Sequence, residues 1–376
     1  MKSKISKVIA LALLSVSQFS VFAQSEKPPI SIGAVLSLTG PLAVAGLPER
    51  DGVRLAIDSL NASGGVQGRR LELVIEDDGS NPDTALSKAN ALVHTRNVKA
   101  LLGGTGLAAT VAMGGVTSAG NIPQISYTGL GPAVEKERRC VFHLTPAQDL
   151  NARGMLEYAA KALNVKQVGV LHDAGFGQAV MASLNQLAGS YGIEIVGVEK
   201  FEIGATELST QAAKLRSSKP QAVLIATSNP AAFRAVKQLR LNVPVVATHI
   251  SAPYDSVKAM GDAAEGVTFA DYLVAEDPLP NQKAFVSAFQ SKFGRMPKNF
   301  DAAGYDSVYI LARGLQQAGP DASGEKICGA LQQRHEGQMA TYDFSAPDMG
   351  GLSVTNFVYS TYSNGKFSRV PFKGGR

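Results

Sequence analysis

The segment Gly104–Ala109 has the residue types and spacing that could hold a phosphate or a carboxylate. It reads Gly-Thr-Gly-Leu-Ala-Ala, which matches the G-x-G-x-x-A turn that binds dinucleotides between a strand and a helix. The segment follows the third predicted strand rather than the first, however. In addition, no acidic residue stands about 20 positions later, where Ser126–Thr128 lies instead. We therefore predict no nucleotide cofactor, and no other cofactor, for this chain.

The glycines keep a physical meaning without a dinucleotide. They let a ligand approach the backbone, and the start of the following helix offers unpaired N–H groups and a positive dipole end. A carboxylate suits such a site as well as a phosphate does. The alternative interpretation is a tight strand–helix turn whose glycines serve packing alone.

No arrangement of side chains in the sequence indicates catalysis or metal binding. None of the five histidines has metal-binding spacing, and neither a G-x-S-x-G elbow nor a P-loop is present. His172 and Asp173 are adjacent, but neighbours at a strand end point apart, so a structural pair is favoured over a catalytic dyad. We expect a protein that is not an enzyme and holds no metal.

The first 23 residues resemble an export signal. Three lysines precede an apolar run, Val8–Ala23, which is short for a membrane span and ends in Val-Phe-Ala. We predict a signal peptide over residues 1–23, cleaved after Ala23, and a periplasmic product; an uncleaved anchor is the alternative. Without those lysines the net charge falls from +5 to about +2. No dense basic cluster remains, so nucleic acid is not an expected partner.

Only two cysteines are present, Cys140 and Cys328. Export would permit them to pair, and their separation fits no zinc or redox motif. A disulfide and two separate buried thiols are both open at this point.

Short apolar runs alternate with amphipathic stretches along the chain, which is typical of α/β folds with parallel sheets. Apolar residues recur at helical spacing around Val53 and around Ala85, and Asn81 with Pro82 should cap the second of these helices. The expected strands are Ile30–Leu36, Leu71–Glu76, Ala100–Gly103, Pro123–Ser126, Gln167–Leu171, Glu194–Lys200, Ala222–Thr227, Val245–Ala247 and Val267–Ala270.

The length and the order of these elements predict two lobes. About 350 residues remain after the signal peptide, more than one core holds comfortably. The strand–helix pattern also restarts after about residue 150. Near the C-terminus, Phe357–Ser363 and Lys366–Val370 flank Asn-Gly, which predicts an antiparallel hairpin.

Several stretches in this order and spacing resemble the leucine/isoleucine/valine-binding protein family. The resemblance covers essentially the whole mature chain. The stretches are Ile32–Pro41, Gly52–Asn61, Gly64–Gly68, Leu71–Asp78, Asn81–Ala91, Gly120–Ser126, Val168–Asp173 and Gly304–Asp306.

The resemblance implies a type I periplasmic binding fold: two doubly wound parallel-sheet lobes, joined by three crossover strands, with the solute in the cleft between them. Carried onto this chain, the crossings fall near residues 145, 273 and 356. Lobe 1 would comprise 28–146 and 274–355, and lobe 2 would comprise 147–273 and 356–372. In such sheets ligands bind beyond the carboxyl ends of strands.

The family's carboxylate-binding loops of lobe 1 correspond to two segments here. In the first loop the usual serine falls on Leu107. The hydroxyl of Thr105 or of Thr110 could take its place, and the backbone N–H groups of Leu107 and Ala108 remain. In the second, Thr128 supplies a hydroxyl and Leu130 replaces a threonine. The expected lobe 1 contacts are Ala45, Gly46, Thr105, Gly106, Leu107, Ala108, Thr128, Gly129, Leu130 and Tyr305.

Lobe 2 departs further from the family pattern. The acidic group that receives the ligand ammonium falls on His249, and a neutral histidine cannot replace that charge. Two tyrosines become Phe176 and Ser228, and a hinge-side aspartate becomes Gln148. Taken singly, Thr128, Phe176 and His249 could each be structural instead: a loop cap, a core residue and a partner for a strand-end carbonyl.

These residues predict the capture component of an ABC importer. Its solute would be a small amino acid or related carboxylate, branched or aromatic, and a carboxylate without an α-amino group is an open alternative. Its partner would be the inner-membrane permease, and we expect a monomer. A sensory module of the same fold and an exported α/β enzyme are the competing hypotheses.

Overall fold

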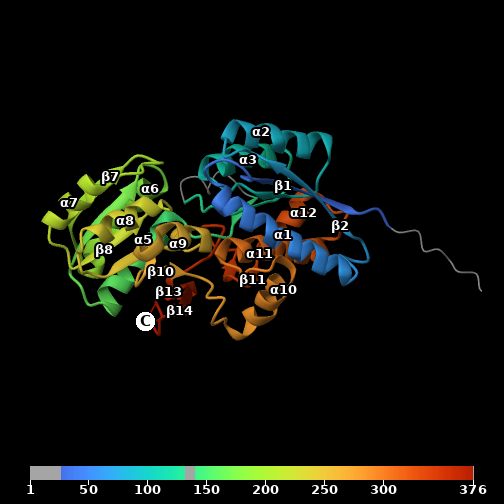
Figure 1. Cartoon of the computed structure of the whole chain (residues 1–376). Helices are drawn as coiled ribbons and strands as arrows, with labels where there is room; N and C mark the ends of the chain where they lie inside the picture. Colours follow the sequence, from blue (N-terminus) through green and yellow to red (C-terminus); the bar gives the residue numbers. More distant parts are fainter. Residues whose placement is uncertain (1–26, 132–139, 376) are drawn as a thin grey trace, which may run out of the picture.

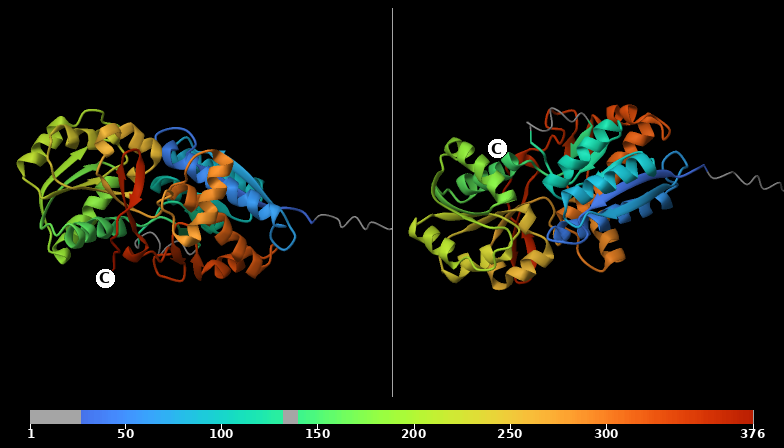
Figure 2. Two further views of the ribbon diagram at one scale, coloured as in Figure 1. Left: turned by 60° about the horizontal axis from the view of Figure 1, so that its bottom comes forward. Right: turned by 90° about the horizontal axis from the view of Figure 1, so that it is seen from above.

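The computed structural model describes residues 27–131 and 140–375. The predicted signal peptide and its cleavage site lie outside these ranges. Two α/β lobes lie side by side, with the blue N-terminal and orange elements in one and the green-to-yellow elements in the other (Figures 1 and 2). None of the helices in these ranges is long and apolar enough to cross a membrane.

Lobe 1 is built on a parallel sheet with strand order β2-β1-β3-β4-β5. Helix α11 packs against α1, so a late segment of the chain completes this lobe. The strands are β1 Ile30–Leu36, β2 Leu71–Asp77, β3 Leu101–Gly103, β4 Gln124–Ser126 and β5 Val141–His143. The helices are α1 Ala43–Ala62, α2 Pro82–Asn90, α3 Leu107–Ala119, α10 Lys283–Phe293, α11 Asn299–Ala318 and α12 Gly324–Leu331.

Lobe 2 has a sheet of order β14-β13-β10-β9-β8-β6-β7, in which β13 and β14 are antiparallel additions to a parallel core. Its strands are β6 Gln167–Asp173, β7 Glu194–Phe201, β8 Ala222–Ala226, β9 Val245–Thr248, β10 Thr268–Asp271, β13 Val358–Ser363 and β14 Lys366–Arg369. Its helices are α5 Gln148–Glu157, α6 Phe176–Leu187, α7 Ser209–Ser217, α8 Pro230–Gln238 and α9 Tyr254–Met260.

The predicted α/β class, the nine strands and the C-terminal hairpin are confirmed, with boundary shifts of one or two residues. Asn81 caps α2 as expected, because its side chain accepts the N–H groups of Asp83 and Thr84 at 2.9 and 3.0 Å. Strand β5 was missed, as was the pair β11 Arg334–Glu336 and β12 Thr341–Asp343. Each is three residues long and lies outside the apolar runs that marked the predicted strands.

Three segments carry the chain between the lobes. One joins β5 to α5, one leaves β10 toward α10, and one leads from β12 into β13. The predicted boundaries at residues 146, 273 and 355 fall within these segments and stay predictions. Cys140 and Cys328 form a disulfide, with Cα atoms 5.7 Å apart, that fastens the start of β5 to α12 within lobe 1.

A buried ion pair joins the two lobes beside the second of these segments. Lys298, at the start of α11, lies 2.6 Å from the carboxylate of Asp271 at the end of β10. Both side chains are almost fully buried, at 3% and 0% exposure. Lys298 also donates to the carbonyl of Leu273, and Ser360 donates to the same Asp271 carboxylate. The pair therefore fixes lobe 1 against two strands of lobe 2.

We expect Lys298→Met to lower the free energy of unfolding by about 3–5 kcal/mol, because Asp271 would be left buried without a cation. Urea unfolding followed by circular dichroism measures this loss. Combining Lys298→Met with Asp271→Asn should recover part of it, because no uncompensated charge then remains.

Lys292→Met is the matched control. Lys292 pairs with Asp58 on the surface, where Asp58 is 69% exposed, so its loss should cost at most about 1 kcal/mol. Equal effects of the two lysine substitutions would contradict a special role for the buried pair.

Candidate functional site

A cavity of about 780 Å³ lies where the carboxyl ends of the two sheets face each other. Lobe 1 contributes residues that follow β1, β3 and β4, and lobe 2 contributes residues that follow β6, β8 and β9. The lining residues are Ser37, Leu42, Val44, Ala45, Ser80, Pro82, Thr105, Gly106, Leu107, Ala108, Ala109, Val111, Ala112, Tyr127, Thr128, Thr145, Pro146, Gln148, Asp173, Gly175, Phe176, Ala179, Ser228, His249, Ile250 and Phe300.

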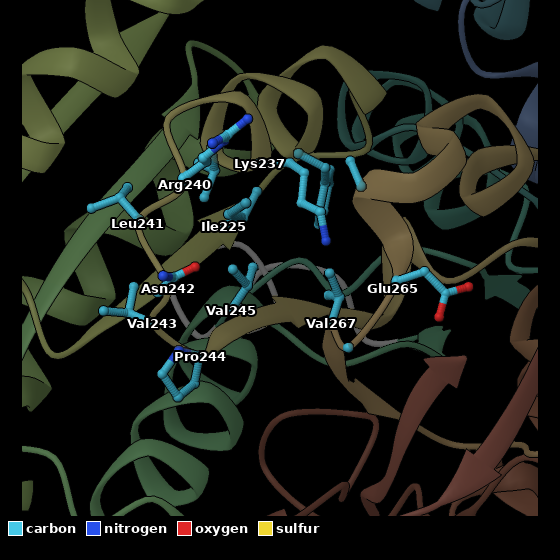
Figure 3. A pocket seen from close by; sticks show the side chains of 14 residues that line it. Ile225, Lys237, Arg240, Leu241, Asn242, Val243, Pro244, Val245, Glu265 and Val267 are labelled. Carbon is cyan, nitrogen blue, oxygen red and sulfur yellow. The ribbon is translucent and has the colours of Figure 1, made fainter. Parts of the chain in front are cut away.

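A second cavity, of about 210 Å³, lies in lobe 2 at the opposite end of the strands (Figure 3). Pro244 and Val267, which line it, stand directly before β9 and β10. It therefore opens at the amino edge of the sheet, whereas ligands of such sheets bind at the carboxyl edge. The cleft between the lobes is the stronger candidate.

Ten of the predicted contact residues line the cleft: Ala45, Thr105, Gly106, Leu107, Ala108, Thr128, Gln148, Phe176, Ser228 and His249. The structure places the other four elsewhere. Gly46 packs against the Ser37 carbonyl, and Gly129 packs against the backbone of Ala147. Leu130 is buried, and the half-buried Tyr305 packs against Tyr309 and Phe285 of lobe 1 with tilted rings. These four positions are not among the residues described as lining the cleft, and their contacts with a solute stay a prediction.

The lobe 1 wall of the cleft contains the start of helix α3. Its N-cap is Gly106, which has no side chain to accept a hydrogen bond. The helical ladder begins with Thr110 N–H donating to the Gly106 carbonyl at 2.9 Å. The N–H groups of Leu107, Ala108 and Ala109 therefore have no intrahelical acceptor. This wall can receive an anionic group.

The backbone conformation at two positions before α3 requires glycine. Gly103 and Gly104 have φ of 118° and 89°, where a side chain would be strained. A Cβ at Gly103 would also lie 2.1 Å from the Val35 carbonyl oxygen of β1. The dinucleotide-like pattern therefore reflects a close turn at the end of β3, which brings the start of α3 to the cleft.

The two threonine hydroxyls of this wall already have protein partners. Thr105 donates to Glu49 at 2.6 Å and accepts the Ser37 N–H at 3.1 Å. Thr128 donates to the Thr105 carbonyl at 2.9 Å. With the protons placed this way, the hydroxyls hold the loops together, and the free donors of the wall are backbone N–H groups.

His249 is buried in the lobe 2 wall, at 2% exposure. Its Nδ1 lies 3.1 Å from Oδ1 of Asn151, and its carbonyl accepts a hydrogen bond from Asn299 in lobe 1. Burial lowers the pKa of His249 to about 4, against the opposing attraction of Asp271. The ring is therefore neutral near pH 7, and His249 connects the two lobes as well as lining the cleft.

Two acidic residues near the cleft were missed as site residues. Asp173 lines it from the end of β6, and its Oδ1 accepts the N–H groups of Gly175 and Gly177 at the start of α6. The His172 ring bonds the Asp173 backbone carbonyl at 2.9 Å rather than the Asp173 carboxylate, which agrees with a structural pair. The sequence feature that could have identified Asp173 is its position between the end of a predicted strand and a helix start that contains glycines.

Glu49 is the second missed acid. It lies behind Thr105 with no exposed surface. It stands four residues before Val53, on the face of the predicted helix that carries apolar residues, so its burial could have been read from the spacing. Burial raises the pKa of Glu49 to about 8, with a further contribution from nearby Asp78 and an opposing one from its hydrogen bond to Thr105.

The described ranges contain no group of three or more His, Cys, Asp or Glu side chains that could hold a metal ion. The polar groups gathered around the cleft suit hydrogen bonding to a small organic solute.

His249 predicts a loss of stability in acid. Its folded-state pKa of about 4 lies below the unfolded value near 6.5. The unfolded state therefore binds the proton first as the pH falls. We expect His249 to remove up to about 3 kcal/mol of folding free energy between pH 6.5 and pH 4. Urea unfolding at several pH values, compared with His249→Gln, measures this term.

The exposed residue His94 supplies the control, because His94→Gln should follow the wild type across the same pH range. If His249→Gln lost stability in acid as steeply as the wild type, another group would be responsible.

Comparisons with known proteins agree with this geometry. A family model described as periplasmic binding protein matches residues 29–350. The leucine-, isoleucine-, valine-, threonine- and alanine-binding protein of Pseudomonas aeruginosa is 25% identical over 358 residues, covering 94% of this chain and 93% of that protein. A Leu/Ile/Val-binding protein homolog of Brucella melitensis is 24% identical over 365 residues, covering 95% and 98% respectively.

Among solved structures, the substrate-binding protein LivJ of Streptococcus pneumoniae, in complex with isoleucine, has a TM-score of 0.82 at 24% identity. The match covers 91% of this chain and 99% of that chain. The leucine-binding protein LivK of Thermotoga maritima has a TM-score of 0.79 at 21% identity, covering 91% and 97%. Both are two-lobed type I periplasmic binding proteins, which confirms the predicted fold. This chain belongs to the periplasmic binding protein family, and several of its relatives are named for binding leucine, isoleucine and valine.

Proposed function

We propose that this protein captures a small amino acid with an apolar side chain and delivers it to the permease of an ABC importer. One observation carries the proposal. The cleft between the lobes combines an anion-receiving helix start with apolar walls and a single carboxylate on the opposite side. Each of these three features corresponds to one part of such a solute.

The solute carboxylate would bind at the start of α3. The N–H groups of Leu107 and Ala108 lack intrahelical acceptors, and the helix dipole favours negative charge there. No Lys or Arg is among the residues described as lining the cleft. A solute with several negative charges would therefore lack counter-charges, which favours a monocarboxylate.

The solute side chain would pack among apolar groups. Leu107 is 41% exposed, although a leucine side chain is favoured in contact with other apolar groups. Phe176 from α6 and Ile250 after β9 face the same cavity from lobe 2. A branched or aromatic side chain between these residues would bury apolar surface of both the solute and the protein.

The solute amino group would lie near Asp173. Neutral His249 provides no negative charge, which left open a solute without an α-amino group. Asp173 supplies an anion from the same lobe, and Oδ1 alone carries its two bonds to the start of α6. An α-amino acid is therefore favoured over its des-amino counterpart.

The role in import, the export to the periplasm and the monomeric state rest on the family and on the predicted signal peptide. Uptake of radiolabelled solute by cells that lack this chain should be lost and then restored by the wild-type protein. Uptake that is unchanged in the deletion strain, with binding intact in vitro, would favour a sensory module.

A solute panel tests the site. We expect L-isoleucine, L-leucine or L-phenylalanine to raise the melting temperature, while the amide of the same amino acid does not, because it lacks the anion for α3. A true solute at about 100 times its dissociation constant adds about 2.7 kcal/mol. If the amides bind as tightly as the acids, the proposed carboxylate site is wrong.

Asp173→Asn tests the amino-group contact. Asparagine keeps an oxygen for the start of α6 but removes the charge, so amino-acid affinity should fall at least about tenfold. The des-amino compound 3-methylpentanoate should bind the variant no worse than it binds the wild type. Isothermal titration calorimetry measures both. A loss shared equally by the two compounds would indicate damage to α6 rather than loss of an ion pair.

A further inference from the structure

Behind the lobe 1 wall of the cleft, one hydroxyl connects the cleft to a fully buried acid. Thr105 lines the cavity. Its Oγ1 lies 3.1 Å from the Ser37 N–H and 2.6 Å from Oε2 of Glu49. Ser37 N–H can only donate in this contact, whereas the proton between Thr105 and Glu49 can belong to either partner.

Glu49 sits in an environment that favours its neutral form. The side chain has no exposed surface, and its second oxygen, Oε1, has no hydrogen-bond partner among residues 27–131 and 140–375. The titratable groups that face it are Asp78 from the β2–α2 loop and Tyr127 after β4. An acid and a phenol offer no compensating positive charge, and the pKa of Glu49 rises to about 8.

The hydrogen bonds that the Thr105 hydroxyl can make depend on whether Glu49 is ionised or neutral. When Glu49 is ionised, Thr105 must donate its only proton to Glu49, and a lone pair is left for the cleft. When Glu49 is neutral, its own O–H can donate to Thr105. Both Thr105 lone pairs are then used by Ser37 and Glu49, and the Thr105 proton is left for the cleft.

We propose that Glu49 is a positioning residue whose proton decides whether Thr105 presents a donor or an acceptor to the solute. This inference rests on the proposed binding of a carboxylate at this wall. With Glu49 neutral, the Thr105 hydroxyl donates to the solute carboxylate beside the start of α3. With Glu49 ionised, Thr105 faces the solute with a lone pair, and a second negative charge lies behind it.

The proton and the solute are therefore linked in binding. Solute binding favours neutral Glu49, so affinity is constant while Glu49 is protonated and falls as the pH rises above about 8. Above that pH, each binding event also takes up part of a proton from the buffer. A threonine that only supported the loop would produce neither effect.

The experiment measures the dissociation constants of L-isoleucine and 3-methylpentanoate at about pH 6.5 and about pH 9.2 by calorimetry. The second compound has no amino group to titrate in this range. For the wild type we expect about tenfold weaker binding at the higher pH, the value of one hydrogen bond to a charged group. Titrations at about pH 8.5 in two buffers of different ionisation enthalpy should reveal proton uptake.

Three variants distinguish the proposed control of Thr105 by Glu49 from a purely structural role of Thr105 in the loop. Glu49→Gln places a permanent N–H donor toward Thr105, so the ratio of the two dissociation constants should fall to about one. Thr105→Val removes the hydroxyl and should also remove the pH dependence, with about tenfold weaker binding at pH 6.5. Thr105→Ser keeps the hydroxyl and should retain the wild-type ratio. Thermal unfolding at both pH values confirms that each variant is folded.

The outcomes are distinct. If a carboxylate binds the wild type equally well at both pH values, without proton uptake, the proposed function stands and the role of Glu49 is wrong. If Glu49→Gln keeps the wild-type pH dependence of binding, the proposed role of Glu49 is likewise wrong. If none of the carboxylate probes binds at any pH, the proposed function and this inference both fail.

Discussion

The geometry of parallel strands determines where this protein can bind. All strands of a parallel sheet end at one edge, and helices begin just beyond it with unpaired N–H groups. Lobe 1 places the start of α3 at that edge, and lobe 2 places Asp173 and the start of α6 at its own. Because the two edges face each other, an N–H-rich wall lies opposite a wall that carries one carboxylate. The chemistry of the cleft follows from this opposition.

Buried ionisable groups around the cleft are stabilised in three different ways. Lys298 and Asp271 compensate each other in an ion pair. His249 is neutral, because burial lowers the pKa of its ring. The ring is also hydrogen-bonded to Asn151. Glu49 has neither a cation nor a full set of hydrogen bonds within the described part of the chain, so its neutral form is favoured. A group that titrates near neutral pH next to a binding surface is a means of coupling proton and solute.

The same residues also connect the lobes. The carbonyl of His249 accepts from Asn299, and Lys298 reaches the end of β10, so the start of α11 touches lobe 2 at two points. Phe300, in the same helical turn, lines the cleft and lies against the His249 ring. Any change in the angle between the lobes must rearrange this junction. Solute contacts in the cleft and contacts between the lobes therefore meet at the same junction, formed by the start of α11 and His249.

The sequence by itself determined the fold class, nine strands of the two lobes, the cap at Asn81 and the C-terminal hairpin, because each depends on a local pattern of apolar residues or turn chemistry. The resemblance to the leucine/isoleucine/valine-binding family also placed ten of the fourteen expected contact residues among those that line the cleft. Only the tertiary structure decided that Tyr305 packs against other rings of lobe 1, that Gly46 and Gly129 face backbone, and that Thr105 has Glu49 behind it. These outcomes depend on which side chains from distant segments meet, and no local spacing encodes such a meeting.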